Sequence, residues 1–262
     1  MQNKALIKLD SVNYSINNKL LIEDISFSVN NGDMVSIIGP NGSGKSTLIK
    51  LITGELSVTS GNVFFNNIKI DDWSSSELAY YRSVLPQSNY LAFPFSVLDI
   101  VKMGRYPIKN STSSENELIC KKILDVFDLS PHINQNYMTL SGGEKQRVQL
   151  ARVFSQIWSD DNYDNRVLII DEPTSYLDIN HQCCLFDFLK SMNKKGLTIV
   201  MVLHDLNQAI INSNKIIMLK KAKLVSYERT NKIIDAEKLE EVFDVKLKLI
   251  KNEESDRMFV TY

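Results

Sequence analysis

The chain of 262 residues has no long hydrophobic run. Its apolar stretches are about seven residues long, as from Leu197 to Leu203, whereas a membrane-spanning helix requires roughly 20 apolar residues. The amino-terminal sequence MQNKALIKLD has lysines but no apolar block of the length found in signal peptides. We therefore expect neither a membrane-spanning segment nor export.

Cysteine is scarce, and neither sign of charge is in excess. Three cysteines, of which Cys183 and Cys184 are adjacent, do not suit a disulfide framework, so we expect a reducing, cytoplasmic compartment. With 30 basic and 31 acidic side chains the net charge is −1, which argues against nucleic acid as a partner. His181 precedes the cysteine pair, but the helical apolar spacing of Asn180–Leu189 favours ordinary helix packing over a metal or haem site.

The amino-terminal third combines hairpin-like strands with one strand-loop-helix unit. Residues Ile7 to Phe27 alternate between apolar and polar, which predicts a sheet built from hairpins. Met34–Ile38 is typical of a buried strand, and the glycine-rich loop after it leads to a predicted helix from Ser46 to Ile52 that Gly54 ends. This order indicates an α/β fold.

The middle of the chain also combines predicted strands with predicted helices. Gly61 to Ile70 predicts a second hairpin, and Asp72 to Ile157 is mostly helical, which we interpret as an inserted subdomain. Two buried strands, Val167–Ile170 and Thr198–Leu203, flank a helix from His181 to Met192, so a parallel sheet is expected.

The tail is expected to add a strand pair and a charged helix. The strands run from Lys215 to Leu219 and from Leu224 to Tyr227, and the helix runs from Ala236 to Phe243.

The loop after the first buried strand reads GPNGSGKST and fits the phosphate-binding pattern in the required strand-helix context. Its glycines let successive backbone N–H groups face phosphate oxygens at a helix N-terminus. We expect Lys45 to reach the β- and γ-phosphates and the Ser46 hydroxyl to ligate Mg²⁺. The nucleotide-binding candidates are Gly39, Pro40, Asn41, Gly42, Ser43, Gly44, Lys45, Ser46 and Thr47.

Two carboxylates end the buried strand that begins at Val167. Asp171 and Glu172 lie where α/β sheets bind ligands, at the carboxyl end of a strand. Asp171 is the candidate Mg²⁺ partner, and Glu172 is the candidate base for an attacking water, a role worth about 10²–10⁴-fold in rate. An acidic pair alone also suits a solvated loop, but the phosphate loop favours the catalytic interpretation.

The stretch Leu140–Arg147, LSGGEKQR, opens a helix with Ser141, Gly142 and Gly143 at its start. A second anion-binding helix N-terminus is one interpretation. A plain serine cap, completed by Glu144 as a capping box, is the other.

These motifs occur together, and in this order, in ATP-binding-cassette ATPases, which the chain resembles along nearly its full length. The resemblance implies an α/β phosphate-loop NTPase core with an antiparallel β subdomain and an inserted α-helical subdomain. The implied division is 1–86 and 161–234 for the β subdomain and core, 87–160 for the helical subdomain, and 235–262 for the tail. It also implies that Ser141, Gly142 and Gly143 bind the γ-phosphate of ATP held by a partner copy, in a homodimer.

Four further positions match the family. Tyr14 resembles the aromatic that stacks on adenine, although a strand tyrosine also packs on a core. Gln87 resembles the glutamine that contacts Mg²⁺, with a polar residue after a proline turn as the alternative. Asp178 resembles the aspartate that links the two sites of a dimer, with Tyr176 in place of the usual alanine. His204 resembles the histidine that hydrogen-bonds the γ-phosphate, with a buried structural histidine as the alternative.

Three stretches point to the transported substrate. Leu85–Pro107 and Val200–Asn207 resemble ATPases of haem, iron-siderophore and cobalamin importers, and Arg147–His181 resembles those of haem importers. The last stretch holds a polar insertion, Ser159–Asn165, which we expect to be a surface loop. Ala222 stands where the family usually has a glycine in a hairpin. A positive φ at an alanine there would cost roughly 1 kcal/mol, and we expect this to affect the tail alone.

The resemblance thus implies an importer subunit that hydrolyses ATP with Mg²⁺ on the cytoplasmic side of the inner membrane. Two copies would act on two membrane permease subunits, and indirectly on a substrate-binding protein. An iron-siderophore or cobalamin importer is the alternative client, and a soluble cassette protein without a permease is the alternative class.

Overall fold

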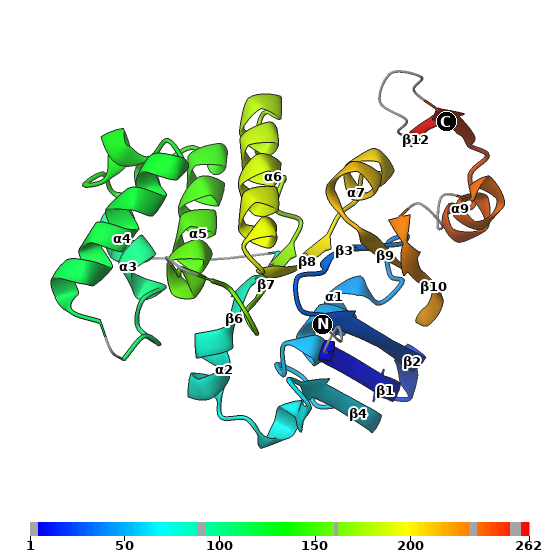
Figure 1. The fold of residues 1–262 in the computed structure, drawn as a ribbon. Coiled ribbons are helices and arrows are strands. Elements are labelled where there is room, and N and C mark those ends of the chain that lie inside the picture. Colours follow the sequence, from blue (N-terminus) through cyan, green and yellow to red (C-terminus); the bar gives the residue numbers. More distant parts are fainter. Residues whose placement is uncertain are drawn as a thin grey trace.

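A six-stranded sheet forms the centre of the protein in the computed structural model, which describes residues 5–87, 93–109, 111–159, 162–230, 235–251 and 258–261 (Figure 1). Its strand order is β10-β9-β3-β8-β7-β6, and all neighbours are parallel except β9 and β10. The strands are β3 (Met34–Ile38), β6 (Arg82–Leu85), β7 (Val167–Asp171), β8 (Thr198–Val202), β9 (Lys215–Lys220) and β10 (Lys223–Arg229). The predicted parallel sheet and the predicted strand pair of the tail are confirmed.

The edge strand β6 falls in a stretch that the sequence predicts as mostly helical. It has four residues, and its partner β7 is distant in the sequence, with Arg82 opposite Val167. So short a segment carries too little periodicity to be recognised from the sequence.

A second, antiparallel sheet has the order β2-β1-β4-β5. Its strands are β1 (Ala5–Ile16), β2 (Lys19–Asn30), β4 (Ser60–Phe65) and β5 (Ile68–Lys69). Asn17–Asn18 form the turn between β1 and β2, and Asn66–Asn67 form the turn between β4 and β5. Both residues of each turn have positive φ, a conformation that asparagine tolerates. Both predicted hairpins are confirmed.

The central sheet is covered on both faces, because successive residues of its strands point to opposite sides. Val35 and Ile37 belong to one core with the antiparallel sheet and α1 (Lys45–Ile52), whereas Met34 and Ile38 belong to a second core with the larger helices. The predicted helices α1 and α6 (Ile179–Lys194) are confirmed, and α7 (Leu206–Asn212), which follows β8, was not predicted.

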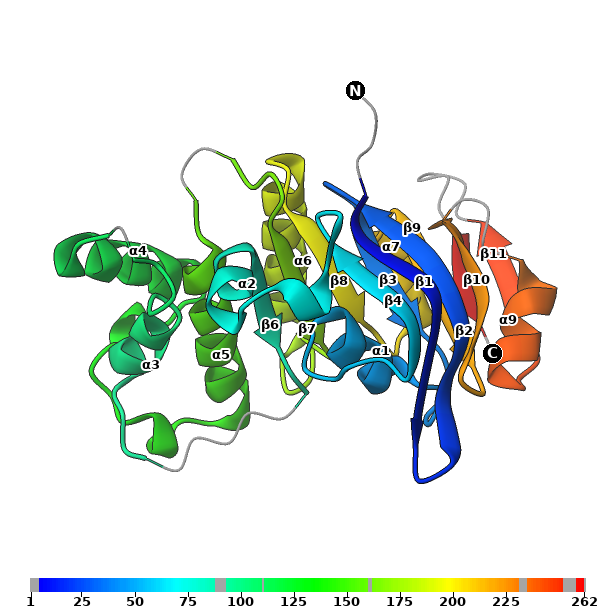
Figure 2. The same ribbon diagram turned by 90° about the horizontal axis from the view of Figure 1, so that it is seen from below.

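Helices α3, α4 and α5 pack together at one end of the molecule, beside β6 (Figures 1 and 2). The helices of this part of the chain are α2 (Ser75–Tyr81), α3 (Val97–Met103), α4 (Ser113–Val126), α5 (Gly142–Ile157) and the short 3₁₀ turns η1 (Ile70–Asp72), η2 (Ser130–His132) and η3 (Tyr137–Thr139). The helical character of this part is confirmed, and the exact division of the chain into subdomains stays a prediction.

The tail forms the predicted helix α9 (Ala236–Phe243) and a further strand pair, β11 (Lys248–Lys251) with β12 (Met258–Thr261). The tail is joined to α7 by Asn207. Its amide donates to the Val260 carbonyl at 3.0 Å and accepts from the Val260 N–H at 2.7 Å. The strand pair was not predicted.

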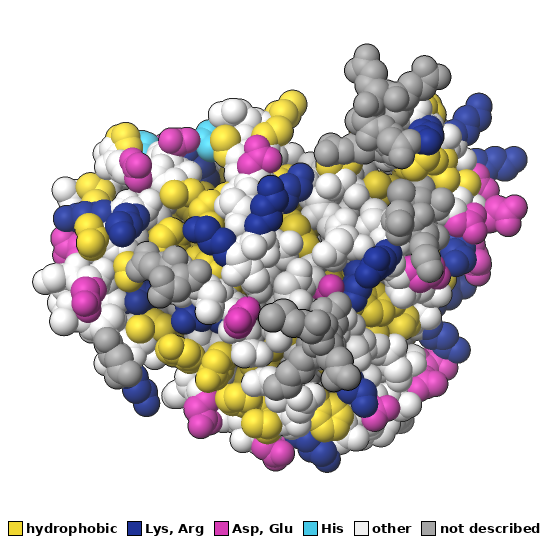
Figure 3. All heavy atoms as spheres, in the orientation of Figure 1, with side chains coloured by type: hydrophobic (Ala, Val, Ile, Leu, Met, Phe, Trp, Pro, Cys, Tyr) yellow, Lys and Arg dark blue, Asp and Glu magenta, His cyan; other side chains and the backbone are white. Residues whose placement is uncertain are grey.

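No helix within the described ranges combines the length and the apolar character that crossing a bilayer demands. On the face shown in Figure 3, Lys and Arg side chains alternate with Asp and Glu side chains.

Candidate nucleotide site

The phosphate-binding loop lies between β3 and α1, as the sequence predicts. Gly39 has a φ of 152°, and a Cβ atom there would lie 2.2 Å from the Leu219 carbonyl oxygen. Gly44 has a φ of 106°, and a Cβ atom there would lie 2.8 Å from the Leu21 carbonyl oxygen. Only glycine fits at these two positions, because a side chain would collide with backbone.

Lys45 points into the loop that precedes it. Its Nζ donates to the carbonyls of Gly39 at 2.8 Å and Pro40 at 3.1 Å. Burial lowers the pKa of Lys45, and the charges of Asp171 and Glu172 act against that shift. The ammonium group therefore sits among the loop's own backbone oxygens, close enough to the carboxylates of Asp171 and Glu172 for their charges to act on it.

Asp171 ends β7 beside the start of α1. Burial, followed by the charge of Glu172, raises its pKa, while His204, Lys45 and a hydrogen bond with Ser46 oppose the rise. Its Oδ1 is buried and has no hydrogen-bond partner among the described residues. An unpaired carboxylate oxygen next to a hydroxyl is a donor set that suits a hard cation such as Mg²⁺.

Glu172 is held by two side chains from other elements. Gln87 Nε2 donates to Glu172 Oε1 at 2.6 Å, and His204 Nε2 lies 2.5 Å from the same oxygen. Burial acts to raise the pKa of Glu172, but the hydrogen bonds and charges of His204, Gln87 and Lys45 together hold it below its usual value. The carboxylate is therefore in the ionised form that a general base requires.

Lys45, Gln87, Glu172 and His204 line one open cavity of about 260 Å³, whereas the buried Asp171 is outside its lining. Its lining residues are Leu21, Asn41, Gly42, Gly44, Lys45, Ser46, Thr47, Gln87, Glu172 and His204. Leu21 was not among the candidates. It enters through the close approach of its carbonyl to Gly44, which no local sequence pattern reveals.

Tyr14 lies outside this lining, as far as the described residues show. It is half-buried on β1, opposite Ile22, and packs against the core of the antiparallel sheet. The structure thus shows its packing on the core, and its stacking on a base stays a prediction.

The LSGGE stretch forms the start of α5, away from the cavity. Ser141 caps the helix and forms a capping box with Glu144, which was the alternative interpretation, and the binding of phosphate by this stretch stays a prediction. Gly142 lies against Tyr176, whose ring atoms would be 3.6 Å from a Cβ there, and a Cβ on Gly143 would lie 2.9 Å from the Tyr176 carbonyl oxygen. Tyr176 is 82% exposed and has a φ of 67°. The residue that departs from the family pattern thus flanks the glycines of α5.

Asp178 caps α6. It accepts from the His181 N–H at 2.9 Å, and its other oxygen lies 2.8 Å from His181 Nδ1. These hydrogen bonds lower the pKa of Asp178.

The expectation of ordinary packing was wrong for Cys183 and Cys184, which are both exposed because they lie on the outer side of α6.

Ala222 contacts the phosphate loop, so the expectation that it concerns the tail alone was wrong. Its φ is 69°, as predicted. Its N–H donates to the Ser43 carbonyl at 3.2 Å, and its own carbonyl accepts from the Glu23 N–H at 2.8 Å. The strands β9 and β3 are parallel neighbours, so the β9–β10 turn and the phosphate loop both follow carboxyl ends on the same side of the sheet. The turn therefore lies against the loop.

The polar insertion is not wholly a surface loop. Tyr163 is 1% exposed and its N–H donates to the Lys195 carbonyl at 3.3 Å, while the Asn165 N–H donates to Asn31 Oδ1 at 3.1 Å. One aromatic ring in the polar stretch is enough to anchor it in the core. Residues 160–161, like residues 88–92 of the Leu85–Pro107 stretch, lie outside the described part of the chain.

Comparisons with known proteins agree with this geometry. Residues 22–175 match the family described as ABC transporter. The hemin import ATP-binding protein HmuV of Escherichia coli O157:H7 is 34% identical over 248 residues, covering 94% of this chain and 95% of the relative. The protein of the same name from Gloeobacter violaceus is 37% identical over 221 residues, covering 84% of this chain and 80% of the relative.

Solved structures of ABC transporters and their cassettes are also similar to this chain. An inward-facing metal-chelate type ABC transporter is similar with a TM-score of 0.80 and 25% identity, over 99% of this chain and 96% of that one. A dimeric bacterial ABC transporter cassette is similar with a TM-score of 0.75 and 28% identity, over 86% of this chain and 98% of that one. The chain therefore belongs to the ABC transporter family, and it is an ATP-binding-cassette ATPase.

Proposed function

We propose that this chain is the ATP-hydrolysing subunit of a haem importer. The single observation that supports ATP hydrolysis is the position of Glu172, which Gln87 and His204 hold in the lining of the phosphate-loop cavity. The choice of haem rests on the relatives named hemin import ATP-binding protein, at 34% and 37% identity over most of the chain.

In this proposal the cavity takes the triphosphate of ATP. Backbone N–H groups of the loop from Gly39 to Thr47, in which Pro40 has none to donate, and the Lys45 ammonium bind the phosphates, and Tyr14 stacks on the adenine. Glu172 accepts a proton from the attacking water, and His204 donates to the γ-phosphate after its Nε2 has left Glu172. Because Glu172 Oε1 already faces both Gln87 and His204, the base is oriented before water arrives.

We propose Mg²⁺ as the cofactor, held by Ser46, Asp171 and Gln87 together with phosphate oxygens. When bound, the ion neutralises charge on the phosphates. The described residues contain no group of three His, Cys, Asp or Glu side chains that could hold a metal, which accords with a site that needs oxygens of the nucleotide. The charge of Lys45 lowers the pKa of both carboxylates, and that of His204 does so more strongly.

We propose that a second copy completes the site. Ser141, Gly142 and Gly143 lie at the start of α5, outside the cavity lining described above, so within one chain they contact no triphosphate placed there. In a head-to-tail homodimer they bind the γ-phosphate held by the partner, and Asp178 links the two sites. The similarity to a dimeric cassette supports this arrangement.

For the permease we propose a groove of about 930 Å³ between α2 and the α3–α4 connection. It is lined by Trp73, Tyr80, Tyr81, Arg105, Trp158 and Arg166, among others. Gln87 is not one of its described lining residues, but β6 joins α2 directly to Gln87. A permease segment seated here, on the cytoplasmic side of the inner membrane, can thus act on Gln87 through one short strand.

Uptake into vesicles tests the proposal. The chain is reconstituted with its permease and given haem, an iron-siderophore or cobalamin, with ATP inside and Glu172→Gln as the inactive control. Haem uptake that requires ATP and is lost in the variant supports the proposal. Uptake of either other compound in place of haem supports the alternative client. ATP hydrolysis without coupling to any permease supports the soluble class.

A further inference from the structure

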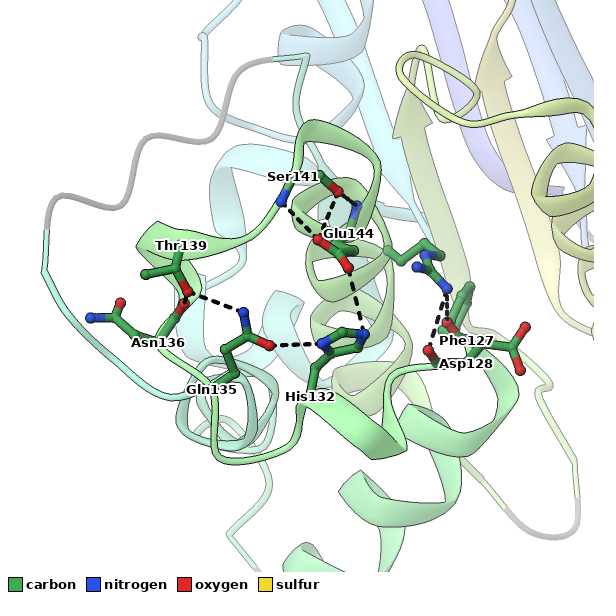
Figure 4. Close-up of polar contacts among 9 residues, drawn as sticks. Phe127, Asp128, His132, Gln135, Asn136, Thr139, Ser141 and Glu144 are labelled. Carbon is green, nitrogen blue, oxygen red and sulfur yellow. Dashed lines mark hydrogen bonds and ion pairs between the residues drawn. The ribbon is translucent and has the colours of Figure 1, made fainter.

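The hydroxyl of Ser141 is engaged within its own helix. Ser141 Oγ donates to Glu144 Oε2 at 2.7 Å, the Ser141 N–H donates to the same oxygen at 2.8 Å, and the Glu144 N–H donates back to Ser141 Oγ at 3.3 Å (Figure 4). A serine hydroxyl has one proton to donate. To donate it to a phosphate, Ser141 must therefore release Glu144.

The second oxygen of Glu144 faces a histidine. His132 Nε2, at the end of η2, lies 3.5 Å from Glu144 Oε1. Three other helices begin with the same capping box, formed by Ser74 with Glu77, Ser96 with Asp99, and Thr112 with Glu115. In the described part of the chain no cation pairs with the carboxylates of those three boxes. The pairing at α5 is thus not a general consequence of capping.

The hydrogen-bond directions around His132 determine which of its nitrogens carry protons. The Thr139 hydroxyl donates to the Asn136 carbonyl at 2.8 Å, so its oxygen accepts from Gln135 Nε2 at 3.1 Å. The amide oxygen of Gln135 then faces His132 Nδ1 at 2.7 Å (Figure 4), and Nδ1 must donate.

Since Nδ1 donates to Gln135, a neutral ring would present the lone pair of Nε2 to the carboxylate of Glu144. That arrangement is repulsive, whereas a second proton on Nε2 makes an ion pair. The hydrogen bonds from Ser141, first through its side chain, also hold the pKa of Glu144 below its usual value, so its carboxylate is charged.

Among the described residues, Glu144 is the charged group that pairs with this ring, and the charge of Arg147 also lowers the pKa of Glu144. On α5, Arg147 Nη1 donates to the carbonyls of Phe127 and Asp128, at 2.9 Å and 3.4 Å. The carboxylate of Asp128 points away from the ring in Figure 4. On the α4 side, Asp125 accepts from the Ser130 hydroxyl at 3.2 Å.

We propose that protonated His132 is a positioning residue for ATP hydrolysis: it retains Glu144 when Ser141 turns its hydroxyl toward the triphosphate of the second copy. When His132 loses its proton, Ser141 is the remaining side-chain donor to Glu144 and stays with it. The affinity for nucleotide then falls. This inference rests on the proposed role of Ser141 in the homodimer.

The test is the KM for MgATP and the kcat, measured from about pH 5.5 to about pH 8.5, where histidine titrates. We compare the natural chain with His132→Gln, His132→Lys and Glu115→Gln, which alters a matched capping box without a histidine. The KM of the natural chain and that of His132→Gln are followed over this pH range. In the natural chain it should rise about two- to fivefold more than in His132→Gln, an effect of the size expected for a partly exposed ion pair. His132→Lys keeps the low KM throughout, Glu115→Gln follows the natural chain, and kcat changes little.

His132→Gln also supplies the baseline for titration of the nucleotide's own phosphate. If its KM follows the same pH profile as the natural chain, the proposal is overturned. A second measurement needs no activity: NMR of the histidine rings should show His132 losing its proton at a lower pH in Glu144→Gln than in the natural chain. An unchanged His132 titration also overturns the proposal, whereas absent ATPase activity in the natural chain counts against the proposed function instead.

Discussion

The side-chain amide of Gln208 on α7 donates to Gln182 Oε1 on α6 at 2.8 Å. Gln182 in turn donates from Nε2 to the Leu177 carbonyl at 2.9 Å. Leu177 immediately precedes Asp178, and α7 follows His204 in the chain. Two side chains therefore connect the segment after His204 to the segment that we propose to link two copies.

Removing this connection should slow turnover. In Gln208→Leu one hydrogen bond is lost, and in Gln182→Leu both are lost, at about 0.5–1.5 kcal/mol each. We expect kcat to fall severalfold in Gln208→Leu and further in Gln182→Leu, with KM for MgATP nearly unchanged. Steady-state kinetics and urea unfolding measure the two effects. Equal kcat in all three proteins would exclude a functional role for the pair.

Substituting the proposed base should abolish hydrolysis without abolishing binding. In Glu172→Gln the amide cannot accept a proton from water, so turnover should fall by at least about 10²-fold. The variant should bind ATP and accumulate as a closed dimer, as size-exclusion chromatography with ATP can show. Hydrolysis at the unmodified rate would refute the assignment of Glu172.

Ala222→Gly should stabilise the protein. Ala222 has a φ of 69°, which glycine adopts without strain, so we expect a gain of about 0.5–1 kcal/mol in the free energy of unfolding. Ala209→Gly, in the buried middle of α7, is the control and should lose about 1 kcal/mol or more. Denaturant unfolding checks both signs. A destabilised Ala222→Gly would show that the turn is not strained.

The three cysteines should separate by reactivity. Cys183 and Cys184 are exposed, whereas Cys120 is buried and burial raises its pKa to about 11. A thiol reagent at neutral pH should modify Cys183 and Cys184 in the folded protein and Cys120 only after unfolding, because the thiolate is the reactive form. Peptide mass spectrometry identifies the sites. Early labelling of Cys120 would mean that α4 opens readily.

Acid should weaken one ion cluster of the helical region. Hydrogen bonds from Lys102 and then Lys121 lower the pKa of Glu117 to about 2. Since the folded pKa lies below that of an unfolded glutamate, roughly 4.3, this contribution is present above that pH and is lost as the pH falls toward about 2. NMR titration of the Glu117 carboxyl, with Glu117→Gln as the reference, measures it. A titration near the unfolded value would show that the lysines do not hold the carboxylate.

The sequence alone determined the elements whose signals are local. A glycine-rich loop between a buried strand and a helix can be recognised because each part has its own periodicity or turn chemistry, and the carboxylates Asp171 and Glu172 follow a strand that is apolar throughout. The hairpins were predicted over Ile7 to Phe27 and over Gly61 to Ile70, and in the structure their turns fall at asparagines, which tolerate positive φ. Ala222 departs from a glycine pattern, yet its positive φ was predicted from that pattern.

Tertiary structure decided what depends on approach between distant segments. That Gln87 and His204 share Glu172 Oε1, and that Leu21 lines the cavity, follows from the order of strands in the sheet. The four-residue strand β6, the burial of Tyr163 and the contact of Ala222 with Ser43 also arise from pairing across the chain. Local sequence carries no record of such pairings, because the side chain that a residue meets is determined by packing and by long-range hydrogen bonds. The contact of His132 with Glu144 belongs to the same class, since the 3₁₀ turn η2 and helix α5 meet only in the folded chain.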